Sequence, residues 1–401
     1  MMRTTAAVLL LVTSCAVDQG TVASDDAPPA PGKADGPGTV ELCAGVSADP
    51  SGGAPASAAI QACLDTTPSG GELALPPGTY RVTSLIRIGR GITLHTAGVA
   101  RDAAACLVTA APPCAVLRAD SALAVPRGFV QLEDSDVTVE HIVIDGDRQA
   151  RLTSLAAQRC AAGTNGPGFN AISAGCDHCT LLMSATINAL CGTGFEWRGA
   201  SAFIGGNLVR DNGDHTRQNM WSDGITIINT ENARVVANYF SDNSDVDLIL
   251  GSNRGGVVQQ NTIVHGHQDS FAGLMLDNFN GTTPGDFEGA QVTNNSITCN
   301  NRCDYGIQLG PHPWYHSSNI LGGTVASNVV AGARMGIDVD GAGTATAPTA
   351  VHANQVSGSP STATFLCGAR PSSRFNVSPD SVVELGAGPA PDTTMLVHDC
   401  P

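Results

Sequence analysis

Short runs in which apolar and polar residues alternate recur along most of the chain. In the stretch Asp223–Leu250, Ile225 and Ile227 form one such run, and Leu248 and Leu250 form another. Alternation with a period of two is typical of a β-strand with one buried face. The sequence therefore predicts many short strands. Residues 145–200 are the exception, because no regular register can be assigned there.

An asparagine followed two residues later by an apolar residue repeats together with these strands. The motif recurs at intervals of roughly 23 to 34 residues, and its asparagines are Asn207, Asn238, Asn261, Asn295, Asn328 and Asn354. Such a repeat is typical of a solenoid whose coils bury their apolar residues against the coils above and below. Asparagine accepts a left-handed turn at low cost, and its amide can bond to the next asparagine in a stack. We therefore expect an asparagine ladder.

The predicted fold class is all-β, a single-stranded parallel β-helix from about residue 70 to 365. A solenoid needs its open end covered. Residues 54–65 have the pattern of a short capping helix with Ala58, Ile60, Cys63 and Leu64 toward the core.

The first residues have the pattern of an export signal. Arg3 precedes the apolar run Ala6–Val12, which ends in small residues before Cys15. This pattern resembles a bacterial lipoprotein signal peptide over residues 1–14, and the resemblance implies cleavage before Cys15 and a lipid on that cysteine. The alternatives are an ordinary secretory signal and a start site placed too early.

Residues 15–40 are rich in Pro, Gly, Ala and Asp, which predicts a flexible tether before a folded domain at 41–401. No later segment is apolar enough to span a membrane. We therefore expect a monomer at the bacterial cell envelope, as an outer-membrane lipoprotein or outside the cell. Only its N-terminal lipid would contact the membrane.

Charge narrows the choice of partner. The chain has 20 basic and 36 acidic residues, a net charge of −16. Such a balance argues against nucleic acid and anionic membrane surfaces. The expected partner is a polysaccharide or a surface glycan.

The chain has 13 cysteines. Disulfides are the default in an exported protein, and an even number of cysteines remains after Cys15. Closeness in sequence predicts the pairs Cys43–Cys63, Cys106–Cys114, Cys299–Cys303 and Cys367–Cys400. The four others, Cys160, Cys176, Cys179 and Cys191, could pair in three ways. Cys176-Asp-His-Cys179 also has the spacing of half a zinc site, but no second pair of suitable spacing follows.

The segment after the predicted helix reads Gly-Gly-x-x-x-x-Pro-Pro-Gly-x-Tyr over residues 70–80. A helix, this motif and then alternating strands resemble the start of pectin-lyase-like right-handed β-helix proteins. The resemblance covers about residues 41–365 as a repeat pattern. It is specific for the fold only, because this fold hosts hydrolases, lyases, epimerases and adhesins.

Two aspartates resemble the acid and a base of polygalacturonase-type glycoside hydrolases. Asp223, followed by Gly224, matches the single aspartate that this family carries on one coil, and Asp245 matches the acid on the next coil. Asp247 lies two residues further on and completes the predicted catalytic set. If the two strands stack in register, Asp223 and Asp245 are one coil and one residue apart. Turn aspartates without chemistry are the alternative.

The resemblance is incomplete. The second aspartate of the family's pair falls on Val246, and the family's histidine falls on Ala272. The basic pair that holds the substrate has no match at Asp304-Tyr305. These departures place the hydrolysis of polygalacturonate itself in doubt.

Two long insertions, 277–289 and 310–322, are expected to wall a cleft along the strand face that carries these aspartates. Aromatic rings near carboxylates suit sugars, although these rings could also simply pin a loop. The predicted substrate-binding residues are His215, Arg217, Trp221, His267, Asp304, Tyr305, His312, Trp314 and Tyr315.

A polysaccharide lyase is the rival enzyme. Its charge neutralisation could come from Arg217, Arg254 or Arg302, since the single lysine, Lys33, lies in the tether. Calcium held by Asp245, Asp247 and Asp269 could serve the same purpose, although no cofactor or metal is otherwise expected. A non-catalytic adhesion or glycan-binding protein is the alternative from another class.

Overall fold

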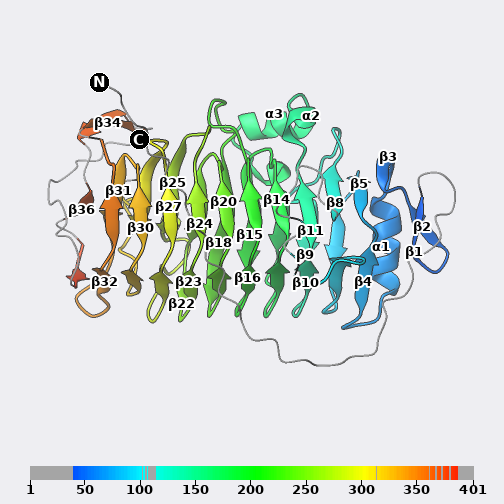
Figure 1. Ribbon diagram of the computed structural model, residues 1–401, viewed down its shortest axis with the longest axis horizontal. Helices are drawn as coiled ribbons and strands as arrows, with labels where there is room; N and C mark the ends of the chain where they lie inside the picture. Colours follow the sequence, from blue (N-terminus) through cyan, green and yellow to red (C-terminus); the bar gives the residue numbers. More distant parts are fainter. Residues whose placement is uncertain are drawn as a thin grey trace, which may run out of the picture. The chain divides into compact units, whose positions relative to one another are not determined.

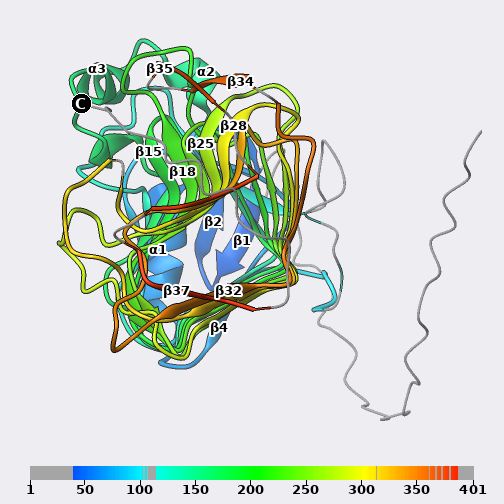
Figure 2. The same ribbon diagram turned by 90° about the vertical axis from the view of Figure 1, so that its left-hand side faces the viewer.

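The structure is a computed structural model that describes residues 39–101, 103, 106, 114–312, 314–360, 362–365, 368–371, 374–378 and 381–386. The predicted signal peptide, Cys15 and nearly all of the tether lie outside these ranges, as do Cys367 and Cys400. Within them, three parallel sheets surround a common core (Figures 1 and 2). No helix in the described ranges has both the length and the apolar character needed to cross a bilayer.

The first sheet is the lower layer in Figure 2, where β4, β32 and β37 are labelled. Its strands are β4 (Glu72–Leu75), β7 (Thr93–Thr96), β10 (Thr138–Glu140), β13 (Thr180–Leu182), β16 (Phe203–Gly205), β19 (Arg234–Val236), β23 (Val257–Gln259), β26 (Gln291–Thr293), β29 (Thr324–Ala326), β32 (Thr349–His352) and β37 (Val383–Leu385).

The second sheet follows the first along every coil. Its strands are β3 (Ser51–Pro55), β5 (Gly78–Val82), β8 (Ala115–Ala119), β11 (Ile142–Asp145), β14 (Ala185–Ile187), β17 (Leu208–Arg210), β20 (Tyr239–Ser241), β24 (Thr262–Val264), β27 (Ser296–Thr298), β30 (Val329–Ala331) and β33 (Gln355–Ser357).

The third sheet completes each coil and carries the predicted site. Its strands are β6 (Ile86–Ile88), β9 (Val130–Leu132), β12 (Ala171–Ser173), β15 (Gly192–Arg198), β18 (Ser222–Glu231), β21 (Val246–Leu250), β25 (Ser270–Leu276), β28 (Cys303–Leu309), β31 (Met335–Val339) and β36 (Phe375–Val377), with β22 (Asn253–Arg254) paired to β18. Outside the three sheets, β1 (Val40–Cys43) pairs with β2 (Val46–Ala48), and β34 (Thr362–Phe365) pairs with β35 (Gly368–Pro371), both antiparallel.

Consecutive strands visit the three sheets in turn, so one passage around the core is one coil. The predicted parallel β-helix is therefore confirmed. Parallel crossovers are right-handed in nearly all proteins, which is the hand that the sequence resemblance implies.

Strand register builds the core. On five successive strands of the third sheet, Ile225, Leu248, Leu274, Ile307 and Ile337 stand in register. Each of them is 0% exposed. Burying such a side chain stabilises the fold by about 1.5–3 kcal/mol. A slip of one residue would turn the whole column outward, so the apolar column specifies the register.

The predicted asparagine ladder is present. From Asn207 to Asn354, each side-chain amide donates to the Oδ1 of the next asparagine at 2.9 Å. The left-handed residue, however, is the one before each ladder asparagine. These residues are Gly206, Ala237, Gln260, Asn294, Ser327 and Ala353, with φ between 53° and 62°. The preceding residue therefore makes the bend, and the asparagine side chain forms hydrogen bonds with the backbone around it.

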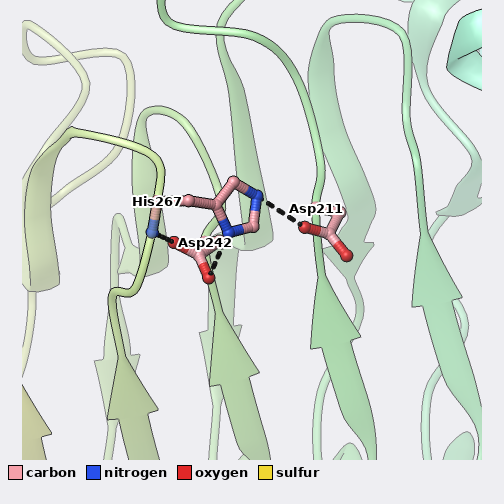
Figure 3. A group of neighbouring side chains, drawn as sticks. All are labelled: Asp211, Asp242 and His267. Carbon is pink, nitrogen blue, oxygen red and sulfur yellow. Dashed lines mark hydrogen bonds and ion pairs between the residues drawn. The ribbon is translucent and has the colours of Figure 1, made fainter.

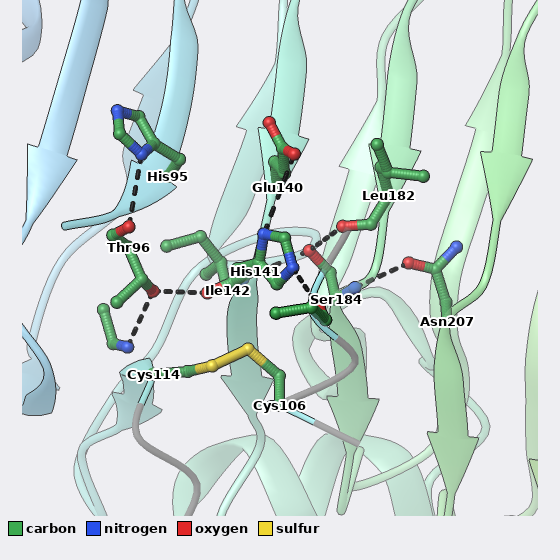
Figure 4. The surroundings of a disulfide bond; sticks show 12 residues. His95, Thr96, Cys106, Cys114, Glu140, His141, Ile142, Leu182, Ser184 and Asn207 are labelled. Carbon is green, nitrogen blue, oxygen red and sulfur yellow. Dashed lines mark hydrogen bonds and ion pairs between the residues drawn. A yellow bond between two sulfur atoms is a disulfide. The ribbon is translucent and has the colours of Figure 1, made fainter. Parts of the chain in front are cut away.

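The ladder continues toward the N-terminal coils with hydroxyl groups (Figure 4). The Ser184 N–H donates to Asn207 Oδ1 at 2.9 Å, and the Ser184 hydroxyl accepts the N–H of Ile142 at 3.1 Å. Two coils before Ser184, the Thr96 hydroxyl accepts the N–H of Ala115 at 2.9 Å. A small hydrogen-bonding side chain thus occupies this corner in most coils.

The capping helix is α1 (Ser57–Thr66), three residues shorter at its start than predicted, because residues 51–55 form β3. Ile60, Cys63 and Leu64 are buried as expected. Ala58 is exposed, and Ser57 is buried in its place. The Ser57 hydroxyl accepts the N–H groups of two residues that follow β5, which ties the cap to the first coil.

Five disulfides lie within the described residues. The predicted pairs Cys43–Cys63, Cys106–Cys114 (Figure 4) and Cys299–Cys303 are confirmed. Among the three alternatives for the other four cysteines, the structure has Cys160–Cys191 and Cys176–Cys179. The second of these uses both thiols of the Cys-x-x-Cys segment, so that segment is not half of a zinc site.

The chain leaves the coils between β11 and β12, where the sequence pattern gave no register. This helical excursion consists of α2 (Arg148–Arg151), α3 (Leu155–Ala161) and the 3-10 helix η1 (Gly166–Gly168), and its two α-helices lie above the strands in Figure 1. Arg151, 0% exposed, donates to the carbonyls of Gly146 and Pro167 at 3.2 and 3.1 Å. Arg151 thereby connects the residue before the excursion, Gly146, to its last helix, η1.

Candidate active site

A pocket of about 350 Å³ opens where the helical excursion meets the third sheet. Its described lining residues come from the excursion, from the turn before β18, from β15 and β18, and from the residue before β21. They are Gly163, Asn165, Phe169, Gly192, Thr193, Glu196, Asn219, Trp221, Asp223, Thr226 and Asp245. The pocket brings two of the three predicted catalytic aspartates together with Trp221.

Strand pairing places Asp223 and Asp245 side by side. Ile225 pairs with Leu248, and the Asp245 N–H donates to the Ser222 carbonyl at 3.1 Å. Asp245 therefore lies one coil and one residue away from Asp223, as the sequence predicts. Both side chains are half-buried.

The environment raises the pKa of both carboxyls. Burial raises the pKa of Asp223 well above its usual value, and the charge of Asp245 raises it further. Burial raises the pKa of Asp245 to about 6. The Thr226 hydroxyl, 2.7 Å from Asp223 Oδ2, and the Val246 N–H, 3.2 Å from Oδ1, hold Asp223 in place. The pair retains a proton at a pH where ordinary aspartates are ionised.

Glu196 is a third carboxylate of the pocket, and its charge is balanced locally. It is 3% exposed and forms ion pairs with Arg127 and with Arg198, whose Nε lies 2.9 Å from Oε1. The Arg127 guanidinium also lies over the Phe169 ring, 5.2 Å from its centroid. Glu196 therefore lines the pocket as a carboxylate that is ion-paired with Arg127 and Arg198.

The 310–322 insertion contributes Tyr315 to the same acidic region. Burial raises the pKa of its hydroxyl. The carboxylates whose charges raise this pKa further are Asp277, Asp245 and Asp223. Tyr315 is not, however, among the described residues that line the pocket.

Asp247, the third predicted catalytic residue, lies elsewhere. It stands in register with Gly224 and Gly273, where a Cβ would point into the core. It is 0% exposed, accepts from Asn243 Nδ2 at 2.7 Å and lies 2.6 Å from His265 Nε2. Asp247 is therefore a buried partner of His265, because its position in the coil faces inward.

The two insertions are expected to wall a cleft along the strand face, and an aromatic side chain from each packs against that face. Beyond β21 the outer face of the third sheet is apolar, with Val246, Ile249, Phe271, Ala272, Met275, Tyr305 and Met335 in one buried cluster. Phe279 and Trp314, one from each insertion, pack against it. The Trp314 and Phe271 rings are 4.8 Å apart. The insertions therefore cover this face, and the pocket lies on the coils before them.

The other predicted substrate-binding residues are engaged away from the pocket lining. Arg217 pairs with Asp214 at 3.1 Å, and His312 pairs with Asp340 at 3.0 Å. The Asp269 N–H donates to His215 Nδ1 at 3.3 Å. Asp304 pairs with Arg334, and Tyr305 is buried against Phe271. Of the predicted site residues, Trp221, Asp223 and Asp245 are the ones that line the pocket.

His267 belongs to a cluster at another corner of the coils (Figure 3). Its imidazole bridges Asp211 and Asp242, at 3.2 and 3.0 Å. These three side chains have the spacing of a metal site. Both imidazole nitrogens are engaged, however, and Asp242 Oδ1 also accepts three backbone N–H groups at 2.8 to 2.9 Å. The cluster is an ion-paired turn.

The carboxylates and arginines proposed for a lyase are also separated. Asp269 pairs with Arg302 at 3.0 Å, and Arg254 pairs with Asp286 at 3.0 Å and with Glu288 at 2.8 Å. Since Asp247 is buried beside His265, the residues Asp245, Asp247 and Asp269 do not form a calcium site.

Sequence reasoning missed Glu196 and the wall formed by the helical excursion. Asn165 and Phe169 are unremarkable in the sequence, since nothing in it shows over which coil the excursion folds. The one available signal is the break in the repeat at residues 145–200, because an insertion into a solenoid often builds a binding surface.

Comparison with known proteins gives a structural likeness without a sequence match. No protein-family model matches the chain, and neither does any curated protein sequence. Solved structures do match. The polygalacturonase from Erwinia carotovora ssp. carotovora has a TM-score of 0.51 and 13% identity, with 83% of this chain and 94% of that chain covered. The exopolygalacturonase from Thermotoga maritima has a TM-score of 0.50 and 13% identity, covering 78% and 85%.

A tailspike protein of E. coli bacteriophage HK620, solved with a pentasaccharide, has a TM-score of 0.56 and 12% identity. The match covers 82% of this chain and 57% of the tailspike. This chain has their fold. The resemblance to pectin-lyase-like β-helix proteins is therefore confirmed at the level of the fold, and similarity at this identity extends no further.

Proposed function

We propose that the protein is a glycoside hydrolase that acts on a polysaccharide through Asp223 and Asp245. The observation that carries this proposal is their pairing in one pocket, where burial raises the pKa of both carboxyls and the charge of Asp245 further raises that of Asp223. Hydrolysis of a glycosidic bond needs one protonated and one ionised carboxyl at the same bond. A pair that shares a proton supplies both states.

The direction of the pKa shifts assigns the roles. Asp223 keeps its proton while Asp245 is ionised, because the charge of Asp245 adds to the burial of Asp223. Asp223 then donates to the leaving oxygen, and Asp245 activates water or attacks the sugar. This order reverses the one that the family resemblance implies. The exposed ring of Trp221 offers a surface for a sugar to stack on.

The fold neighbours support a polysaccharide as the substrate. Two are named as polygalacturonases, and the tailspike was solved with a pentasaccharide. A lyase is less well supported, because it needs a cation to neutralise a sugar carboxylate. The arginines considered for that task are paired with acids elsewhere.

The test is a screen of soluble polysaccharides for new reducing ends, read together with the absorbance of unsaturated uronates. Reducing ends without that absorbance identify a hydrolase. On a cleaved polymer, Asp223→Asn and Asp245→Asn should each lower kcat by about 100-fold or more. Asp136→Asn, at an exposed turn, is the control and should keep full activity. Full activity in both active-site variants would contradict the proposal.

A non-catalytic glycan-binding protein is the second candidate. It is favoured by Val246 and Ala272, which stand in the strand column of Asp223 where the hydrolases carry further catalytic groups. It predicts binding without turnover, with Trp221→Ala weakening the binding and Asp245→Asn leaving it nearly unchanged.

We also infer export and lipid attachment at Cys15. The five disulfides support an oxidising compartment. Cys15→Ala should move the protein from the membrane fraction to the soluble fraction, and an unchanged distribution would argue against the lipid.

A further inference from the structure

The charges around the pocket limit the kind of sugar that it accepts. Among the described residues that line it there is no lysine, arginine or histidine, whereas Glu196, Asp223 and Asp245 are acidic. The chain as a whole carries a net charge of −16. A sugar carboxylate would therefore enter a region of like charge.

The guanidinium groups beside the pocket are already used. Arg127 and Arg198 both pair with Glu196, one on each carboxylate oxygen. Arg127 is held further by the ring of Phe169. Both guanidinium groups are therefore engaged with Glu196, and neither is among the described residues that line the pocket.

The remaining lining groups include neutral hydrogen-bonding side chains and two aromatic rings, Phe169 and Trp221. The side-chain amides of Asn165 and Asn219 can bond to hydroxyls, and Trp221 exposes 37% of its surface. This is the chemistry that recognises uncharged rings, through hydroxyl hydrogen bonds and stacking on C–H faces.

We propose that the substrate is a neutral glycan and that polyuronates are excluded by the charge of the pocket. This inference rests on the proposed hydrolase function and departs from the substrate of the polygalacturonases that share the fold.

Matched polymers test it. Polygalacturonate and its fully methyl-esterified form share one backbone and differ in charge, and an uncharged galactan and xylan extend the comparison. We expect kcat/KM to be at least tenfold higher on an uncharged polymer than on the charged one. Cleavage that requires Asp245 and is fastest on polygalacturonate would overturn the substrate inference and leave the hydrolase proposal standing. The absence of Asp245-dependent cleavage from every polymer would overturn the hydrolase proposal.

Binding measured by calorimetry gives a readout that does not need turnover. Neutral oligosaccharides should bind more tightly than uronate oligosaccharides of the same length, and the opposite order overturns the inference.

A charge-swapping variant sharpens this test. Asn165 is exposed at the rim of the pocket, so Asn165→Arg adds a cation there. We expect it to raise the affinity for uronate oligosaccharides about fivefold at low ionic strength, and the gain should fade in 0.5 M salt because of screening. Asn165→Gln is the control without charge. Equal uronate affinity in the two variants would show that charge does not exclude uronates.

Discussion

At the scale of single residues, the buried carboxyl of Asp277 destabilises the folded protein when it is ionised. It is 1% exposed, and neither carboxyl oxygen has a hydrogen-bond partner among the described residues. The N–H groups of Asn278 and Phe279 face it without reaching hydrogen-bond geometry, and burial raises its pKa to about 6. The ionised form is therefore disfavoured in the folded state.

We predict that Asp277→Asn stabilises the protein at pH 7.5 by up to about 3 kcal/mol. The folded-state pKa lies above the unfolded value. Stability is therefore lost as pH rises from about 4 through about 6 in the parent protein, and this loss is absent from the variant. The gain should vanish at pH 3.5. Denaturant titrations at both pH values measure it, with Asp65→Asn on the exposed side of α1 as the control. A gain that is equal at both pH values would contradict this account.

Two tryptophans form a matched pair with different environments. Trp221 lines the pocket, whereas Trp314 packs against Phe271. Trp221→Ala should raise KM about tenfold with little change in melting temperature. Trp314→Ala should lower the free energy of unfolding by roughly 2 kcal/mol or more, because it opens the apolar cluster to water. Enzyme kinetics and thermal melts on both variants check this. The assignment is refuted if Trp221→Ala destabilises the fold and Trp314→Ala mainly raises KM.

At the scale of elements, the asparagine ladder closes the corner between the first and second sheets. Asn295 donates to Asn328 Oδ1 and to the Val258 carbonyl, and its Oδ1 accepts two donors from Asn261. Asn295→Ala leaves these buried groups unpaired and should cost roughly 2–4 kcal/mol of stability. The neighbouring Ser296→Ala, at an exposed position, should cost less than about 0.5 kcal/mol. Similar costs in the two variants would mean that the ladder contributes little.

A buried ion pair holds the turn between β24 and β25 against β21. His265 and Asp247 are both 0% exposed. Burial alone would lower the pKa of His265, but the Asp247 carboxylate raises it above its usual value. The contribution of the pair is full below about pH 6.5 and is lost as pH rises through the raised pKa of His265.

Removing one partner of this pair tests its role. Asp247→Ala leaves His265 buried without its carboxylate and should cost about 3–5 kcal/mol at pH 6. The cost should shrink at pH 9, where His265 is neutral in both proteins. Thermal melts at the two pH values measure it, and a cost that is independent of pH would point to lost packing instead.

At the scale of the whole molecule, the pocket depends on a segment that lies outside the coils. Cys160–Cys191 ties α3 to the start of β15. Replacing both cysteines by alanine should free the wall that carries Asn165 and Phe169. We expect a several-fold higher KM and faster proteolysis within residues 148–168, with the melting of the coils nearly unchanged. Removing Cys299–Cys303, which lies on a later coil, is the control and should leave KM unaltered.

The sequence by itself determined the coils and the pairing of two aspartates. The alternation of apolar residues and the repeat of Asn207 to Asn354 are local patterns, and stacking equivalent coils turns them directly into register. The place of Asp223 beside Asp245 follows from that register. Three disulfides likewise followed from cysteines close in sequence.

Tertiary structure alone decided which side chains meet at the pocket. Asp247 faces inward and Trp314 covers an apolar face, because the coil departs from strict alternation before Leu248 and the insertions fold down onto the sheet. The helical excursion brings Asn165 and Phe169 to aspartates that are more than fifty residues away in the chain. Loops are not bound by the repeat that fixes strands, so their placement depends on contacts between distant segments that no local pattern encodes.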